Sequence, residues 1–261
     1  MNWWQGIILG IVQGLTEFLP ISSSGHLVVA QAAVGVQMPG VQVEVVLHVA
    51  TLLAVLIVYR STLLTLSRGL VARDPGAWKY ALLLVLATVP AAVIGLWLAD
   101  VFQKAFDSLF AVGINFLVTG MILWSTRLVP EAIDGKPDVK RALAIGVSQA
   151  LAILPGISRS GTTIAAAMWL RIRPVAAAEF SFLLAIPAVA GAAVLLLTDL
   201  PATGAIVWNG SLILSFLCAL ISGIAAIRLL IALLHRRAFH RFAPYCWVLG
   251  VVTMAWAVVS A

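Results

Sequence analysis

Charged residues are scarce in this sequence. Lysine and arginine number 16 and aspartate and glutamate 10 among 261 residues, so 10% of the chain is charged, whereas 62% is hydrophobic and the mean hydropathy is +1.10. A soluble domain carries charge on about a quarter of its residues. The composition therefore excludes a soluble globular protein and indicates an integral membrane protein. Because bundled membrane helices pack as one unit, we expect a single domain over residues 1–261.

Cysteine is almost absent as well. Cys218 and Cys246 lie in apolar segments without a partner at metal or redox spacing, so we expect two buried thiols and neither a disulfide framework nor a cysteine metal site. A basic leader is also missing, and Glu17 interrupts the apolar N-terminal stretch. These features predict mature structure there rather than a cleaved signal peptide.

The formal net charge is +6, but the basic residues stand at the ends of apolar segments. This placement is typical of charges that orient membrane helices, and it argues against a nucleic-acid interface. Residues 60–79, 127–141 and 236–241 are rich in lysine and arginine, and we expect them on the cytoplasmic side. The turns at 100–107 and 199–210 hold one lysine between them, so these turns and both termini are expected outside.

Six apolar runs are long enough to cross a bilayer, for which about 20 helical residues are needed. Two further apolar segments, residues 3–30 and 142–170, are interrupted in the middle by proline, glycine, hydroxyl and charged residues, which a lipid-facing helix does not tolerate. We therefore predict an all-α membrane protein with six transmembrane helices and two re-entrant helix-loop-helix pairs. The six runs cover residues 42–59, 80–99, 109–126, 178–198, 211–234 and 244–260.

The two interrupted segments resemble each other. "GIVQGLTEFLP" followed by "ISSSG" matches "GVSQALAILPG" followed by "ISRSG". Because one pair is expected to enter from outside and the other from the cytoplasm, the halves at about 1–126 and 142–261 form an inverted-topology repeat, whose broken helices usually build a site near the membrane midplane. The shared positions are Gly10, Gln13, Leu15, Leu19, Pro20, Ile21, Ser22, Ser24 and Gly25, matched by Gly146, Gln149, Leu151, Leu154, Pro155, Ile157, Ser158, Ser160 and Gly161.

Each interruption has the pattern of an anion site. A proline ends one helix and a serine-rich run opens the next, so backbone N–H groups and hydroxyls converge at a helix N-terminus, which favours phosphate. Arg159 adds a planar fork suited to phosphate oxygens. Glu17 and His26 complete the polar cluster. The candidate phosphate-binding residues are Ser22, Ser24, Gly25, Ser158, Ser160, Gly161, Thr162 and Thr163.

Structural interpretations stand beside the functional ones. The serines could serve only as helix caps, and Glu17 could form a purely structural pair with Arg159. Gln13 and Glu17, at i and i+4, could hold a divalent cation or form a plain hydrogen-bonded pair. His26 could be an interior histidine, and His48 is interpreted as structural.

The motifs "QGLTEFLPISSSGH" and "PGISRSGTT" resemble the two signature motifs of the bacterial undecaprenyl-diphosphate phosphatase family, also called bacitracin-resistance proteins. The resemblance extends through "HVATLLAVLIVYR" and "FSFLLAIPAVAGA" over nearly the whole chain. The family's first motif has Glu or Gln, three residues, then Glu; this chain has Gln13 and Glu17 there. The resemblance implies functional roles for Glu17, Ser23 and His26 and for Ser158, Arg159 and Thr163.

The resemblance also implies an activity. The expected substrate is a polyprenyl diphosphate in the bacterial inner membrane, hydrolysed to the monophosphate and phosphate so that the carrier lipid serves cell-wall synthesis again, with bacitracin resistance as a consequence. A Mg²⁺ or Ca²⁺ ion on Glu17, with Gln13 beside it, is implied as a cofactor. Oligomeric state stays open, a homodimer included.

The attacking group is left open by the sequence. Ser23 activated by His26, His26 itself, or a water are the alternatives, with Glu17 as orienter, base or metal ligand and Arg159 as the clamp on the phosphates. The polar residues around "SSSGH" predict a site open to the outer face. A transporter or flippase of polyprenyl phosphate is the rival function, since inverted repeats and broken helices serve transport equally well.

Overall fold

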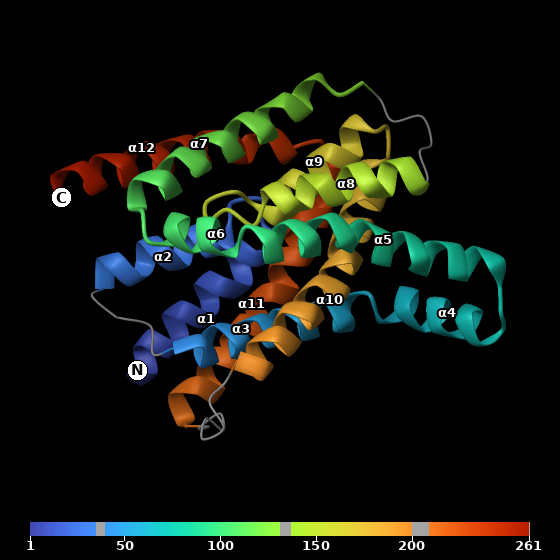
Figure 1. The fold of residues 1–261 in the computed structure, drawn as a ribbon, viewed down its shortest axis with the longest axis horizontal. Helices are drawn as coiled ribbons and strands as arrows, with labels where there is room; N and C mark the ends of the chain where they lie inside the picture. The colour runs from blue at the N-terminus through green and yellow to red at the C-terminus, as the bar shows by residue number, and fades with distance from the viewer. Residues whose placement is uncertain (35–39, 131–136, 200–208, 261) are drawn as a thin grey trace.

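A computed structural model describes residues 1–34, 40–130, 137–199 and 209–260, and every element in these ranges is helical (Figure 1). The α-helices are α1 (Trp3–Phe18), α2 (Ser23–Val34), α3 (Gly40–Val58), α4 (Arg60–Val71), α5 (Pro75–Trp97), α6 (Ala99–Phe106), α7 (Leu109–Ser125), α8 (Val139–Leu151), α9 (Arg159–Trp169), α10 (Pro174–Asp199), α11 (Gly210–His235) and α12 (Ala243–Val259). Short 3-10 helices, η1 (Thr126–Leu128) and η2 (Phe239–Phe242), follow α7 and precede α12.

Within the described ranges, four helical segments are long and apolar enough to cross a membrane: Pro75–Trp97, Leu109–Leu128, Gly210–His235 and Phe239–Val259. A fifth crossing results if α3 and α4, bent by 77° at their junction, are counted as one span. The protein is therefore an all-helical, multi-pass membrane protein.

The run predicted at 178–198 falls on α10, whose described apolar segment, Pro174–Ala188, is shorter than a span. Part of the turn expected at 199–210 lies outside the described residues. The prediction of six crossings is thus matched by four to five candidates, and the full count stays a prediction.

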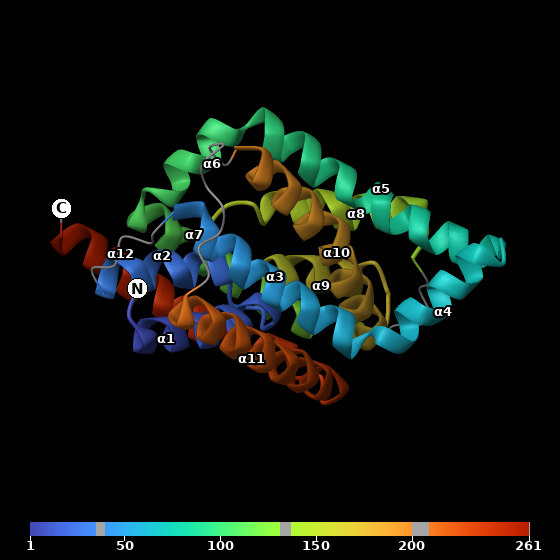
Figure 2. The same ribbon diagram turned by 90° about the horizontal axis from the view of Figure 1, so that it is seen from below.

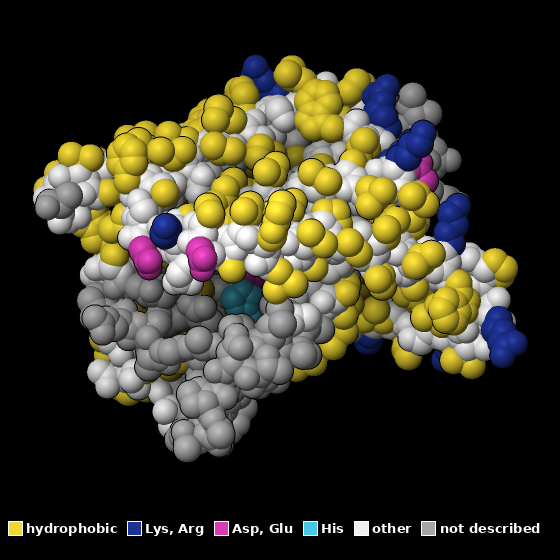
Figure 3. Space-filling model, in the orientation of Figure 1, with side chains coloured by type: hydrophobic (Ala, Val, Ile, Leu, Met, Phe, Trp, Pro, Cys, Tyr) yellow, Lys and Arg dark blue, Asp and Glu magenta, His cyan; other side chains and the backbone are white. Residues whose placement is uncertain are grey.

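The outward surface is apolar, as contact with lipid requires. Trp97 is 85% exposed and Leu96 and Val252 are more than half exposed, which water would penalise and hydrocarbon does not. Figure 3 shows hydrophobic side chains spread over α5, α7 and α12. In the same view, Lys and Arg side chains gather toward the end where α4 turns into α5, and acidic side chains lie beside α6.

The two helix interruptions expected from the sequence are present. α1 ends at Phe18 and α2 begins at Ser23, whereas α8 ends at Leu151 and α9 begins at Arg159. Pro20 and Pro155 fall inside these breaks, where a missing N–H and a fixed φ end a helix. We call residues 19–22 the first loop and residues 152–158 the second loop.

The helices of the two halves interlock. α1 packs along α11, α8 packs along α5, and α7 pairs with α12 (Figures 1 and 2). Small residues allow these close approaches: a Cβ on Gly10 would collide with the Ser215 carbonyl of α11, and one on Gly146 with the Ala87 carbonyl of α5. The halves therefore bury their faces against each other rather than within themselves.

Candidate functional site

The two loops meet in the middle of the helix bundle. The Ser22 hydroxyl accepts a hydrogen bond from the Gly156 N–H at 3.2 Å, and the Ser160 hydroxyl donates to the Leu19 carbonyl at 3.2 Å. Gly25 has no room for a side chain, because a Cβ there would stand 2.8 Å from Gly156 Cα. Side-chain hydroxyls thus join the two loop regions, far apart in sequence, to each other's backbone.

Glu17, in the last turn of α1, is the centre of the polar cluster. Arg159 Nη2 donates to Glu17 Oε1 at 2.7 Å. On the other carboxylate oxygen, Ser23 Oγ donates at 2.6 Å and Gln13 Nε2 at 3.2 Å. The Glu17 side chain is only 7% exposed. Four side chains from α1, α2 and α9 therefore form one network around a buried carboxylate.

Part of this network is incompletely paired. Among the described residues, the buried atoms Arg159 Nη1 and Gln13 Oε1 have no hydrogen-bond partner. Buried polar groups are normally paired because an unmade hydrogen bond costs free energy. The unpaired guanidinium nitrogen is a donor available to an anion, and the unpaired amide oxygen is an acceptor available to a cation.

The second loop is held by α7. Asn115 Nδ2 donates to the Pro155 carbonyl at 2.7 Å, and the Thr119 hydroxyl donates to the Gly156 carbonyl at 2.8 Å. Thr119 Oγ1 also accepts from the Ser158 N–H at 3.1 Å. Gly156 has φ of +94°, a left-handed conformation that favours glycine. These contacts fix the loop that presents Arg159.

Most of the predicted phosphate-binding groups already have partners inside the protein. Ser22 and Ser158 cap α2 and α9 by accepting from the N–H groups of Gly25 and Gly161. The Thr163 hydroxyl donates to the Arg159 carbonyl at 2.7 Å and lies 2.6 Å from Ser181 Oγ. These hydroxyls therefore build the loops, as the capping interpretation expects.

The other predicted phosphate-binding residues differ in whether their hydroxyls have a hydrogen-bond partner. Ser24 Oγ lies 3.4 Å from Ser22 Oγ, and Ser160 Oγ lies 3.3 Å from Ser158 Oγ. The buried Thr162 hydroxyl has no partner among the described residues. Arg159 Nη1 and the Thr162 hydroxyl are thus the two unpaired donors that the described residues show among these candidates, and the phosphate-binding roles of all of them stay predictions.

His26 takes different partners from those the sequence suggested. Its Nδ1 lies 2.7 Å from the Ser22 carbonyl and its Nε2 lies 2.7 Å from the Tyr245 hydroxyl. Within the described part of the chain, no hydrogen bond joins His26 to Ser23. Ser23 is instead paired with Glu17.

His48, interpreted from the sequence as structural, stands at the same cluster. Its Nε2 lies 4.0 Å from Glu17 Oε2, and its side chain is 38% exposed. A lone histidine in an apolar helix gives no signal of this position, because the contact depends on how α3 packs against α1.

Sequence reasoning also missed Asn115, Thr119 and Tyr245. A signal existed for the first two, since polar residues at i and i+4 share one face of an otherwise apolar helix. Tyr245, near the start of the last helix, carried no comparable signal.

A divalent cation would find only part of a ligand set here. In the described ranges, no three His, Cys, Asp or Glu side chains lie close enough together to hold a metal ion. The Glu17 carboxylate and the unpaired Gln13 Oε1 are oxygen donors of the kind that Mg²⁺ and Ca²⁺ prefer. The charge of Glu17 is offset by Arg159. These residues therefore fit a cation that brings further oxygen ligands from a phosphate.

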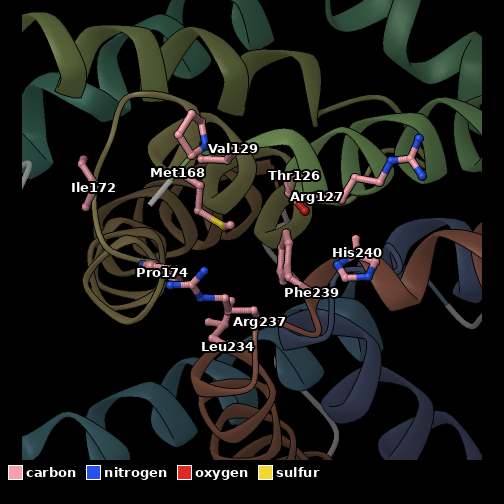
Figure 4. A pocket seen from close by; sticks show the side chains of 11 residues that line it. Thr126, Arg127, Val129, Met168, Ile172, Pro174, Leu234, Arg237, Phe239 and His240 are labelled. Atoms are coloured by element: carbon pink, nitrogen blue, oxygen red, sulfur yellow. The ribbon is translucent and has the colours of Figure 1, made fainter. Parts of the chain in front are cut away.

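A separate cavity of about 220 Å³ lies at the far end of α9 (Figure 4). Met168 lines it, nine residues and about 14 Å along the helix from Arg159. In Figure 4 the Arg237 side chain points toward Pro174 and Met168, whereas the Arg127 side chain points away from them. This cavity is distinct from the loop site. Its lining includes Thr126, Ile172, Leu234, Phe239 and His240.

Comparison with known proteins gives a consistent result. A chain from Desulfosudis oleivorans named undecaprenyl-diphosphatase is 46% identical, covering 96% of this chain and 97% of its own length. Another of that name from Carboxydothermus hydrogenoformans is 39% identical, with 97% of each chain covered. "Undecaprenyl-diphosphatase 4" from Bacillus thuringiensis is 40% identical, covering 97% and 96%.

The family comparison covers the same region. The model of a family described as bacitracin resistance protein BacA matches residues 6–252, a range that includes both loops and all the residues around Glu17. This chain belongs to the bacitracin resistance protein BacA family.

Proposed function

We propose that this protein is a membrane phosphatase that hydrolyses undecaprenyl diphosphate to undecaprenyl phosphate and inorganic phosphate. The observation that carries the proposal is the Glu17 carboxylate, which holds a hydroxyl at 2.6 Å and a guanidinium at 2.7 Å in one buried site. A potential nucleophile, a proton acceptor and a phosphate clamp are thereby within reach of one phosphoryl group. The names of the relatives agree with this activity.

Ser23 is the favoured attacking group. Its Oγ would attack the terminal phosphorus while its proton passes to Glu17, and the bond to the bridging oxygen would break to release the polyprenyl phosphate. Glu17 would pass that proton on to the leaving phosphate. Water would then attack the phosphoserine, and its proton would pass through Glu17 to Ser23 Oγ as the O–P bond breaks, which frees Ser23 and phosphate. Direct attack by water or by His26 remains an alternative, but the 2.6 Å contact of Ser23 with a carboxylate favours the serine route.

Arg159 would have two tasks in this scheme. Its free Nη1 is placed to bind a phosphate oxygen, where it would stabilise the charge that gathers on the oxygens during transfer. As the guanidinium turns toward the diphosphate, Glu17 would lose its neighbouring cation and accept the serine proton more readily. The pair seen in the structure is in this view the resting state.

A divalent cation would be held by Glu17 and Gln13 Oε1 together with oxygens of the diphosphate. When bound, it would supply positive charge to the phosphate oxygens. Because the chain offers one carboxylate at this point, we expect such a cation to bind together with the substrate.

The proposed membrane arrangement has six crossings and two re-entrant pairs in an inverted repeat. Three observations support it: helices α1, α2 and α3 begin 134–136 residues before α8, α9 and α10 begin, the halves interlock, and the two loops meet. The basic end at the α4–α5 turn would face the cytoplasm and both termini the outside of the bacterial inner membrane. The first loop would then be reached from the outer face.

Phosphate release by the purified protein in detergent tests the function. Wild-type protein should release phosphate from undecaprenyl diphosphate, and Glu17→Gln should be at least about a hundredfold slower because the proton acceptor is lost. Asp107→Asn, an equivalent change on an exposed residue, should be unaffected. Tight substrate binding with no phosphate release by the wild type would favour the transporter or flippase alternative.

The accessible face has its own test. Proteoliposomes of known orientation would carry substrate in both leaflets, and phosphate would be measured separately inside and outside. Release should appear on the side of the first loop. Release confined to the side of the α4–α5 turn would contradict the proposed opening.

A further inference from the structure

Tyr245, near the C-terminal end of the chain, contacts His26 just after the first loop. It lies in the first turn of α12, directly after Pro244, and its hydroxyl is 2.7 Å from Nε2 of His26. The two rings lie nearly parallel, with centroids 5.8 Å apart and planes 3° from parallel. The neighbouring Cys246 is fully buried, with its thiol 3.9 Å from the Pro20 carbonyl. The start of α12 therefore contacts the first loop and the first turn of α2 through two adjacent residues, Tyr245 and Cys246.

The partners of His26 define its tautomer. Nδ1 lies 2.7 Å from the carbonyl of Ser22, which can only accept, so Nδ1 carries a hydrogen. In a neutral imidazole, Nε2 is then the acceptor, and the Tyr245 hydroxyl must donate to it. The hydrogen bond at Nδ1 therefore decides that Nε2 is the unprotonated nitrogen of the neutral ring.

The contacts of His26 also fix the ring in space. The edge of Phe116 on α7 contacts the imidazole at a centroid distance of 5.3 Å, nearly perpendicular to it. The Ser22 carbonyl accepts the hydrogen bond from Nδ1. Ser22 itself has a left-handed backbone conformation with φ of 70°, and its hydroxyl accepts a hydrogen bond from the Gly156 N–H. The Tyr245 hydroxyl is the hydrogen-bond partner at Nε2. Without this hydroxyl, Nε2 would lose its only hydrogen bond that the structure describes.

We propose that Tyr245 is a positioning residue that acts through His26, donating to Nε2 of the Nδ1–H imidazole and so holding that nitrogen at the edge of the site. The proposal rests on the proposed phosphatase function for the consequence in turnover, but not for the hydrogen bond at Nε2. Tyr245 is 47% exposed, so its hydroxyl lies at the rim of the cluster rather than inside it. Its hydroxyl contacts His26, whereas Ser23 and Arg159 are the groups bonded to Glu17.

The first measurement is a tautomer assignment by nitrogen NMR of histidine side chains in detergent, with His26→Ala to identify the signal. Wild-type protein should show His26 with a protonated Nδ1 and an unprotonated Nε2. Tyr245→Phe retains the ring but removes the donor to Nε2, so the Nε2 signal should move to that of a ring nitrogen without a hydrogen bond, while Nδ1 stays protonated on the Ser22 carbonyl. An unchanged Nε2 signal in Tyr245→Phe would overturn the proposal, whatever the activity of the protein.

The second measurement is a double-mutant cycle on phosphate release. Tyr245→Phe should lower kcat by about five- to tenfold with little change in KM, as the loss of one oriented hydrogen bond predicts. In the His26→Ala background the same change should have no further effect. An equal loss in both backgrounds would show that Tyr245 acts independently of His26 and would overturn the proposal.

Matched controls come from the chain itself. Tyr59→Phe removes a buried hydroxyl that has no partner among the described residues, and it should leave both the His26 signals and kcat unchanged. Thermal unfolding of each variant separates misfolding from mispositioning. If wild-type protein released no phosphate, the proposed function would fail, whereas the NMR comparison would still decide the link between Tyr245 and His26.

Discussion

Glu17 and Arg159 lie 142 positions apart in the chain, and their side chains meet at 2.7 Å in the interior. Arg159 and Ser23 both bond to Glu17 and stand at the helix starts that follow the two loops. They occupy equivalent positions of the repeated "ISSSG" and "ISRSG" segments. One half of the repeat therefore supplies a hydroxyl where the other supplies a cation. This difference converts two similar loops into one asymmetric site.

The Arg159 fork is the first target for mutation. Arg159→Lys retains the charge but loses the planar fork that suits phosphate oxygens, so we expect at least a tenfold loss in rate, about 1.4 kcal/mol of barrier. Arg159→Ala should lose more and also destabilise the fold by leaving Glu17 buried without its cation. Phosphate release and thermal unfolding measure the two effects. Near-normal turnover in both variants would remove Arg159 from the site, and Arg73→Lys serves as the surface control.

Adjacent serines should separate chemistry from folding. Ser23→Ala removes the hydroxyl bonded to Glu17, and we expect a loss of at least about a hundredfold in kcat with an unchanged melting temperature. Ser22→Ala removes the acceptor of the Gly156 N–H and should chiefly lower the melting temperature. The reverse order of effects on kcat would rule out Ser23 as the attacking group.

His48 offers a test of a contact that the sequence did not reveal. Its Nε2 stands 4.0 Å from Glu17, where a donor would help to orient the carboxylate. His48→Gln can still donate, so it should retain turnover within about threefold, whereas His48→Leu should lose roughly tenfold. Equal turnover in both variants would leave His48 with a packing role only.

The contact between the loops sets a steric prediction. A Cβ on Gly25 would lie 2.6 Å from the Phe116 ring and 2.8 Å from Gly156 Cα, so Gly25→Ala should destabilise the fold by about 1–3 kcal/mol. Gly210 has no neighbour within 4 Å of an added Cβ, and Gly210→Ala should be near neutral. Thermal unfolding in detergent compares the two. Equal melting temperatures would show that the loops are not packed as described.

The orientation of the chain can be read by labelling. In a variant lacking Cys218 and Cys246, a cysteine placed at Gly76 should resist an impermeant thiol reagent in intact cells, because the basic α4–α5 turn is expected inside. A cysteine at Lys104, in α6, should be labelled strongly. The opposite pattern would invert the proposed topology and with it the face to which the site opens.

The sequence predicted the membrane class and both helix breaks correctly, because their signals are local. Low charge and long apolar runs indicated a helical membrane protein, and proline and serine at fixed positions located both helix breaks. Local signals did not decide the number of crossings, because α3 bends into α4 and α10 has only a short described apolar segment. Length and hydropathy do not record such bends.

By itself, then, the sequence determined the membrane class, the two interrupted segments, the repeat that relates them and the set of polar residues that they carry. These properties depend on composition and on spacing along one helix or loop. The partners within that set were decided only by the tertiary structure, which placed Ser23 on Glu17 instead of His26, Tyr245 on His26, and His48 beside the carboxylate. Each of these pairings depends on which faces two helices turn toward each other. That choice is made by the packing of the whole bundle, and no local pattern in the chain encodes it.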